Sequence, residues 1–404
     1  MKHLFALAFA ASAAFGLYAA EPADTTATDT VKGFGFVDQI VIPSTPVKDQ
    51  NRSGTCWSFA GTGFFENEIL RNTGDTVDLS EMFVVRKCYE DKADRYVRLY
   101  GNTNFSPGGS VLDVPYVMVR YGLMPEEAYR GLEYGEDKHV HGELQGVLEG
   151  IVTNVVKKPN RKVSTAWRKA LDGVLDAYLG EVPATFTYKG TTYTPQSYAK
   201  SLGINPDDYV AVTSFTHHPF YEPFILEICD NWLWEKYHNV PLDELKAIID
   251  NALENGYSLG WAADVSEGGF KWIDGVALMP RGKDEGDLTG TELARWVKLP
   301  SSQRSSEKYN FNGPVEEIEV TQELRQQMFD SQETTDDHGM IIVGTAVDRL
   351  GNKYYKVKNS WNTYQVYDGY IYVSEPYMLA KTLDIYVNKK AVPANIAKKM
   401  GIKR

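Results

Sequence analysis

The chain has 404 residues, of which 43% are apolar and 12% aromatic, so it is long enough to bury a large core. Its formal net charge is -12, and no run of basic residues stands out. A nucleic-acid-binding protein needs a basic surface to neutralise phosphates, so this charge balance argues against that class. The three cysteines are an odd number, which allows at most one disulfide and leaves at least one thiol free.

The N-terminus has the pattern of a signal peptide. Lys2 gives it a basic start, the apolar run 4–17 follows, and small residues continue to Ala20. This run is too short to span a bilayer comfortably. We therefore expect residues 1–20 to be a cleaved signal peptide and residues 21–35 to be a disordered spacer. The mature protein is then periplasmic or secreted, with no membrane association after signal removal.

Residues 36–404 have the composition of a globular domain. Its expected secondary structure changes from helices to strands along the chain. Helices are expected over 56–71, 110–121, 165–179 and 242–255, and strands over 340–347, 353–358 and 370–373, with a strand pair around Lys189 and Gly190. Helices come first and strands follow, which predicts an α+β fold. We expect a helical lobe over 36–205 that carries a large insertion, a strand-rich lobe over 206–404, and a cleft between them.

Cys56 follows the potential capping residues 53–55 and therefore stands at the N-terminus of the first expected helix. The unpaired N–H groups there lower a thiol pKa, which favours the nucleophilic thiolate. Such a cysteine also needs a histidine as base and acid, an amide or carboxylate that orients it, and a donor for the oxyanion. His338 at the start of an expected strand, Asn359 at the end of the next strand, and Gln50 before Cys56 are the candidates.

The other cysteines and histidines have plainer explanations. We expect Cys88 and Cys229 to be small buried apolar residues, and the sequence leaves open whether they pair. His217 and His218 are adjacent and cannot easily face one metal ion in regular structure. We therefore predict neither a metal ion nor an organic cofactor.

The segments around Gln50 and Cys56, His338 and Asn359 resemble the Q-x-G-x-C-W, [DN]-H-[AG] and N-S-W motifs of papain-like cysteine peptidases, in the same order. The resemblance implies that residues 36–404 are a peptidase domain with the papain-like two-lobe fold and a β-barrel-like second lobe. It also implies that Cys56 is the nucleophile, His338 the general base and acid, Asn359 its orienting partner, and Gln50 the oxyanion donor. Gln50 as a solvated loop residue is the plainer alternative.

Three further residues take substrate-binding roles from the same resemblance. Gly108 and Gly109 look like the family's Gly-Gly strand, whose backbone pairs with an extended peptide, although a tight turn is the alternative. Trp361 would shield the hydrogen bond between the histidine and the asparagine. Asp336, which precedes His338 closely, either raises the pKa of that histidine or is simply solvated.

The branch of bleomycin hydrolases and aminopeptidases C fits better than papain itself. The spacing between Cys56 and His338 is wide, and the segments 259–265 and 387–393 are similar to segments of that branch. The resemblance implies an aminopeptidase that acts on peptides and assembles as a homohexamer with inward-facing sites.

Two differences from that branch keep alternatives open. Its members are usually intracellular, whereas we expect this protein to be exported. They also carry a C-terminal arm that lies in the cleft, and we expect this chain to stop at residues 401–404, before such an arm. An endopeptidase or oligopeptidase with an open cleft is therefore the alternative activity. A non-catalytic peptide-binding protein is a more remote one, because all the expected catalytic residues are present.

Overall fold

The structure is a computed structural model, and it describes residues 33–283, 286 and 288–404. The predicted signal peptide and nearly all of the predicted spacer lie outside the described residues. Residues from Gly33 to Arg404 pack into one compact unit. None of the helices in the described part of the chain is both long enough and apolar enough to cross a membrane.

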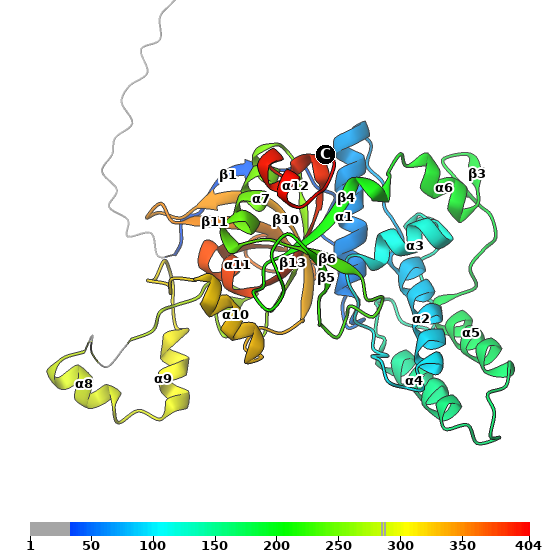
Figure 1. Cartoon of the computed structure of the whole chain (residues 1–404), viewed down its shortest axis with the longest axis horizontal. Helices are drawn as coiled ribbons and strands as arrows, with labels where there is room; N and C mark the ends of the chain where they lie inside the picture. Colours follow the sequence, from blue (N-terminus) through cyan, green and yellow to red (C-terminus); the bar gives the residue numbers. More distant parts are fainter. Residues whose placement is uncertain (1–32, 284–285, 287) are drawn as a thin grey trace, which may run out of the picture. The chain divides into compact units, whose positions relative to one another are not determined.

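Helices dominate the chain up to residue 201, and strands dominate after it (Figure 1). The helices are α1 Cys56–Thr73, α2 Glu81–Arg98, α3 Asp113–Tyr121, α4 Gly142–Val156, α5 Ala166–Leu179, α6 Pro195–Ser201, α7 Leu242–Glu254, α8 Gly290–Trp296, α9 Ser301–Lys308, α10 Gln322–Asp330, α11 Glu375–Lys381 and α12 Ala394–Lys399. The strands are β1 Val37–Val41, β2 Phe186–Tyr188, β3 Thr191–Tyr193, β4 Tyr209–Thr213, β5 Pro223–Ile225, β6 Lys236–Asn239, β7 Leu259–Ala263, β8 Phe270–Lys271, β9 Val276–Ala277, β10 His338–Val347, β11 Lys353–Lys358, β12 Tyr370–Ser374 and β13 Thr382–Asn388.

The elements predicted from local signals are present. The four predicted helices correspond to α1, α3, α5 and α7, and the predicted strands to β2, β3 and β10 to β12. The predicted capping of α1 by a side chain is wrong, because no side chain caps its first turn. The hydroxyls of Ser53 and Thr55 bond each other instead, at 2.6 Å.

The strands after residue 209 form one mixed sheet, which β1 joins by pairing with β10. Its order is β5-β6-β4-β13-β7-β10-β11-β12-β9-β8, and most neighbours are antiparallel. The pairs β4–β6 and β9–β12 are parallel. Within the described residues the two ends of this order do not pair, so the expected barrel-like lobe is an open sheet. β10 and β11 form the predicted hairpin at its centre.

Helix α1 lies between the sheet and the other helices of the first half (Figure 1), and it contacts β10 and β7 as well as α2 and α3. It is buried nearly all round, which explains why small and apolar residues occur on every face. A Cβ at Gly61 would overlap Val114, and one at Gly63 would lie 2.8 Å from Cδ1 of Ile341. The two glycines let neighbours on both sides approach the helix axis closely.

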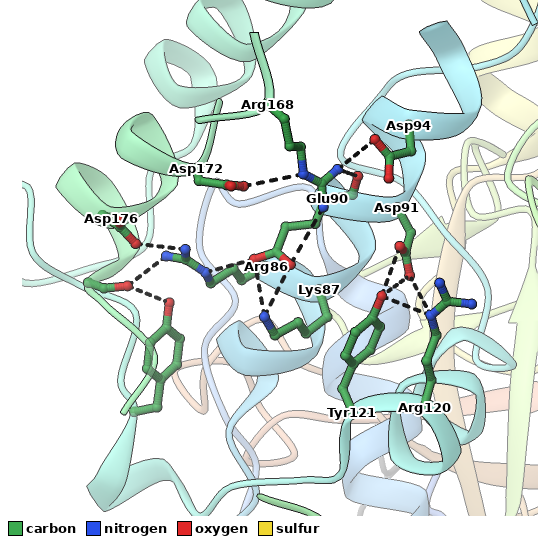
Figure 2. Close-up of polar contacts among 12 residues, drawn as sticks. Arg86, Lys87, Glu90, Asp91, Asp94, Arg120, Tyr121, Arg168, Asp172 and Asp176 are labelled. Atoms are coloured by element: carbon green, nitrogen blue, oxygen red, sulfur yellow. Dashed lines mark hydrogen bonds and ion pairs between the residues drawn. The ribbon is translucent and has the colours of Figure 1, made fainter. Parts of the chain in front are cut away.

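Helix α2 is an 18-residue element without a simple apolar stripe, because charged residues occupy the side that faces α5. Figure 2 shows this network. Arg86 pairs with Asp176 at 2.7 Å and with Glu90 at 3.1 Å, and Arg168 pairs with Asp94 at 3.0 Å. The packing of α2 against α5 therefore depends partly on ion pairs, which an apolar periodicity cannot reveal.

A buried carboxylate joins the N-terminal segment to α1 and α2. Glu66 of α1 is fully buried and accepts hydrogen bonds from the Thr45 hydroxyl at 2.6 Å, the Lys48 ammonium at 3.0 Å and the Leu79 N–H at 2.8 Å. Burial alone would raise the pKa of Glu66, but Lys48 and these hydrogen bonds together hold it below its ordinary value of 4.5. Glu66 is thus charged in the folded protein at neutral pH.

Replacement of Glu66 by glutamine should destabilise the fold by about 3 kcal/mol at neutral pH, because it removes one partner of a buried ion pair. The free energy of unfolding in urea would measure this loss. Since the folded-state pKa is lowered, the loss should shrink as the pH falls below about 4.5. The exposed Glu254→Gln variant is the control and should change stability by less than about 0.5 kcal/mol. Equal stability of the two variants would contradict the assigned role of Glu66.

Candidate active site

Cys56 is the first residue of α1, and it lines the same pocket as His338, the first residue of β10. The backbone N–H groups of Gly339 and Trp57 interact with the sulfur. Because α1 packs against β10, residues that are far apart in the sequence form one wall of this pocket. The structure therefore brings the predicted nucleophile and the predicted base together.

The imidazole of His338 is held from two sides. Its Nε2 lies 2.7 Å from Oδ1 of Asn359, and the ring of Trp361 lies over it with the ring centroids 4.5 Å apart. His338 and Asn359 are both buried. The hydrogen bond occupies Nε2 and leaves Nδ1 as the nitrogen for proton exchange. This arrangement fits the positions predicted for Asn359 and Trp361, while their roles stay predictions.

Gln50 is buried beside the same loop but does not line the pocket of Cys56. The side-chain Oε1 of Gln50 accepts a hydrogen bond from the Ser360 hydroxyl at 2.6 Å. The backbone N–H of Gln50 donates to the Ser360 carbonyl at 2.8 Å. With the oxygen occupied, the Nε2 amide is the end of Gln50 that remains as a donor. Gln50 is thus an anchored residue rather than a solvated one, and the oxyanion role stays a prediction.

Gly109 lines the pocket, and Gly108 adjoins it. A Cβ at Gly108 would overlap the carboxylate of Asp230, and a Cβ at Gly109 would lie 2.9 Å from the indole of Trp57. A side chain at either position would therefore collide with its surroundings. The absence of side chains at the two glycines lets Asp230 and Trp57 lie close to this backbone. Pairing of the same backbone with a peptide stays a prediction.

The electrostatics of the pocket oppose an ionised pair of Cys56 and His338. Burial raises the pKa of the Cys56 thiol, the N–H of Gly339 lowers it, and the carboxylates of Asp230 and Asp336 raise it further. Burial lowers the pKa of His338 to about 4, although the hydrogen bond that its Nε2–H donates to Asn359 acts to raise it. These effects favour a neutral thiol and a neutral imidazole. The N-terminus of α1 acts in the opposite direction, toward the thiolate.

Sequence reasoning missed two acidic residues in this pocket. Asp230, in the loop after β5, and Asp384, in β13, line it together with Asp336. Asp384 had a detectable signal, since it is a single acidic residue in a strand that is otherwise suited to burial. Asp230 had none, because it lies in an irregular segment. Asp336 was noted beside His338, but its field acts on Cys56.

All three cysteines are free. Cys88 is buried in α2 as predicted, whereas Cys229 is exposed, so its prediction as a buried apolar residue is wrong. Within the described residues, one group of side chains lies close enough to share a metal ion: His217, His218 and Glu227. The two imidazole Nε2 atoms lie 3.1 and 2.9 Å from the carboxylate. The adjacent histidines therefore do converge, but none of the three residues lines the pocket of Cys56.

Comparisons with known proteins agree with this site. Residues 38–197 match the family described as papain family cysteine protease, and residues 290–403 match the Peptidase C1-like family. Aminopeptidase C of Lactobacillus delbrueckii subsp. lactis is 22% identical over 89% of this chain and 83% of its own. Cathepsin L2 of Homo sapiens is 38% identical over 21% of this chain and 23% of its own.

A solved structure has the same fold. The crystal structure of PepW from Lactobacillus rhamnosis HN001 superimposes with a TM-score of 0.67 at 18% identity, over 90% of this chain and 84% of that one. Fold, site and family matches define a papain-like cysteine peptidase, and the chain belongs to that family. Within the family it lies on the branch of aminopeptidase C and bleomycin hydrolase.

Replacement of Asn359 by alanine should lower kcat about tenfold or more, because the imidazole of His338 loses the acceptor that fixes its orientation. KM should change little, because Asn359 does not line the pocket that receives the peptide. Steady-state kinetics on one peptide substrate would separate the two parameters. Asn154→Ala, on the exposed side of α4, is the matched control. An unchanged kcat, or a loss confined to KM, would contradict an orienting role.

Proposed function

We propose that the protein is a cysteine aminopeptidase, which removes residues from the N-terminus of peptides through an acyl-enzyme on Cys56. The observation that carries the proposal is the shared pocket of Cys56 and His338, with His338 fixed by Asn359. The aminopeptidase C relatives supply the exopeptidase part of the proposal, since they align with most of this chain.

The geometry supports a two-step hydrolysis. In the first step the Cys56 sulfur attacks the peptide carbonyl, and its proton passes through Nδ1 of His338 to the departing amine. The C–N bond breaks, and a thioester forms on Cys56. In the second step His338 takes a proton from water, the resulting hydroxide attacks the thioester, and the thiol leaves with that proton. The backbone N–H groups at the start of α1 and the Nε2 of Gln50 are the proposed donors to the oxyanion in both steps.

The endopeptidase alternative has less support. Relatives named aminopeptidase C align over 85–89% of this chain, whereas cathepsin L2 aligns over 21% of it. The short match covers one segment of the chain and carries no information on which end of a peptide is cleaved. A peptide-binding protein without turnover is disfavoured by the family membership and by the presence of every expected catalytic residue.

Export and assembly belong to the proposal as well. The basic start and apolar run at the N-terminus support a signal peptide, and hence a periplasmic or secreted enzyme. The branch resemblance supports a homo-oligomer, of which the hexamer is the form implied.

A panel of short peptides, each with a free and an N-acetylated amino terminus, tests the activity. Wild-type protein under reducing conditions should cleave the free peptides and lose most activity on the acetylated ones. Cys56→Ala should reduce cleavage by about 10⁴-fold or more, because the nucleophile is absent. Equal cleavage of both peptide sets would favour the endopeptidase. Equally inert wild type and Cys56→Ala would contradict catalysis.

Export is tested by expression of the full chain in a bacterial host, followed by N-terminal sequencing of the periplasmic and secreted fractions. The expected N-terminus lies just after Ala19 or Ala20, because small residues precede the cut. An intact Met1 in a cytoplasmic product would contradict the signal peptide.

A further inference from the structure

The pocket of Cys56 contains more acidic groups than the proposed reaction uses. The carboxylates of Asp230, Asp336 and Asp384 line it, and they come from the loop after β5, the segment before β10 and strand β13. Three separate parts of the fold thus contribute carboxyl groups to the lining of one pocket. Asp337 also lines the pocket, but its carboxylate is occupied by the Thr335 hydroxyl and by two backbone N–H groups.

Asp384 is the group that most requires a partner. Its side chain lies in a fully buried strand and is 2% exposed, and its Oδ2 has no hydrogen-bond partner in the described part of the chain. A buried polar atom without a partner is costly, and a buried charge more so. Because Asp384 lines the pocket, the partner that the fold lacks can come from a bound molecule.

The protein supplies little positive charge to offset these acids. No ion pair in the described residues involves Asp230, Asp336 or Asp384. The ammonium of Lys92 donates to the carbonyls of Ser106 and Gly108 and lowers the pKa of Asp230, but it does not line the pocket.

The remaining contacts of the acids are neutral. Asp230 accepts from the Asn104 amide at 3.2 Å, and its own N–H donates to Asp336 at 3.2 Å. Burial raises the pKa of Asp336 to about 7, and the neighbouring Asp230 adds to the increase. Burial likewise raises the pKa of Asp384, with a further contribution from Asp336. Carboxylates that share a pocket repel one another when both are charged, which raises their pKa values, and a bound cation relieves that repulsion.

We propose that Asp230, Asp336 and Asp384 form a receptor for a cationic nitrogen of the substrate, a primary ammonium or a guanidinium, in the pocket beside Cys56. The proposal rests on the proposed function, because it assumes that the peptide is attacked by Cys56. Two parts of a peptide carry such a nitrogen: the free α-amine of its first residue, and the side chain of a lysine or arginine. Asp230 adjoins Gly108, so the cation lies next to the backbone that would align the peptide.

This receptor also links substrate charge to the reactivity of the thiol. The carboxylates of Asp230 and Asp336 act against ionisation of Cys56. A cation bound between them and the sulfur cancels that field and favours the thiolate. A cationic substrate would therefore assist the nucleophile that attacks it, whereas a neutral peptide would meet a less reactive thiol.

Two matched pairs of fluorogenic substrates separate the sources of the cation. Alanyl-aminomethylcoumarin against its N-acetyl form tests the α-amine. Acetyl-lysyl-alanyl-aminomethylcoumarin against the norleucyl analogue, which keeps the aliphatic chain without its charge, tests the side chain. The wild type should prefer the cationic member of at least one pair. In Asp384→Asn and Asp336→Asn the ratio of kcat/KM between the members of that pair should fall about tenfold or more, because a buried counter-charge is lost.

The substrate pair whose kcat/KM ratio falls identifies the source of the cation. The Glu254→Gln variant controls for net charge and should leave both ratios unchanged. The receptor proposal would be overturned if both ratios stayed unchanged in the Asp384 and Asp336 variants. It would also be overturned if the wild type preferred neither cationic substrate over its neutral partner.

Calorimetry can measure how the inactive Cys56→Ala variant binds the corresponding peptide amides, which it does not cleave. This measurement requires no turnover and so separates this proposal from the proposed function. Tighter binding of the cationic amide, lost when Asp384→Asn is added, would support the receptor even if no peptide were hydrolysed. Equal affinity of cationic and neutral amides would overturn it.

Discussion

The close contact between the start of α1 and the start of β10 is the constraint on which the site depends. Gly339 follows His338, and a Cβ there would lie 3.2 Å from the Cα of Trp57. Gly63 permits the same closeness about two turns further along the helix, against Ile341. These contacts place the helix N-terminus, with its partial positive charge, directly beside the histidine. The catalytic geometry is therefore a consequence of backbone packing, and the loop with Asn359 and Trp361 only completes it.

The charges around this contact are balanced in an unusual way. The helix N-terminus favours a thiolate, whereas burial and the carboxylates of Asp230 and Asp336 oppose it. Burial and these carboxylates thus keep the proton on the thiol and leave the imidazole neutral. An incoming group with positive charge changes that balance, which connects recognition to chemistry in one pocket.

The sequence predicted the parts of the fold that have local signals. Helix α1, Cys56, His338 and Asn359 lie in short motifs, and the hairpin of β10 and β11 has a turn that can be read directly. Helix α2 escaped prediction because its contact face is charged. The open form of the sheet also escaped, since the pairing of β5 with β6 and of β8 with β9 joins short strands that carry little periodicity.

The acidic pocket could not be predicted for a different reason. Asp384 stands out in its strand and Asp336 lies near His338 in the sequence, but nothing local links them to each other or to Asp230, and only the fold brings the three into one pocket. Asp384 becomes significant once β13 is known to lie between β4 and β7. Convergence of this kind depends on tertiary topology, which a single sequence does not contain.

The ion pairs between α2 and α5 respond to ionic strength differently from the apolar contact between α1 and the sheet. Arg168 and Asp94 are both partly exposed, so added salt screens their attraction. The contact between α1 and the sheet is apolar and buried, and strongly hydrated salts strengthen such contacts. Added salt therefore weakens the Arg168–Asp94 pair between α2 and α5 and leaves the apolar contact of α1 with the sheet intact.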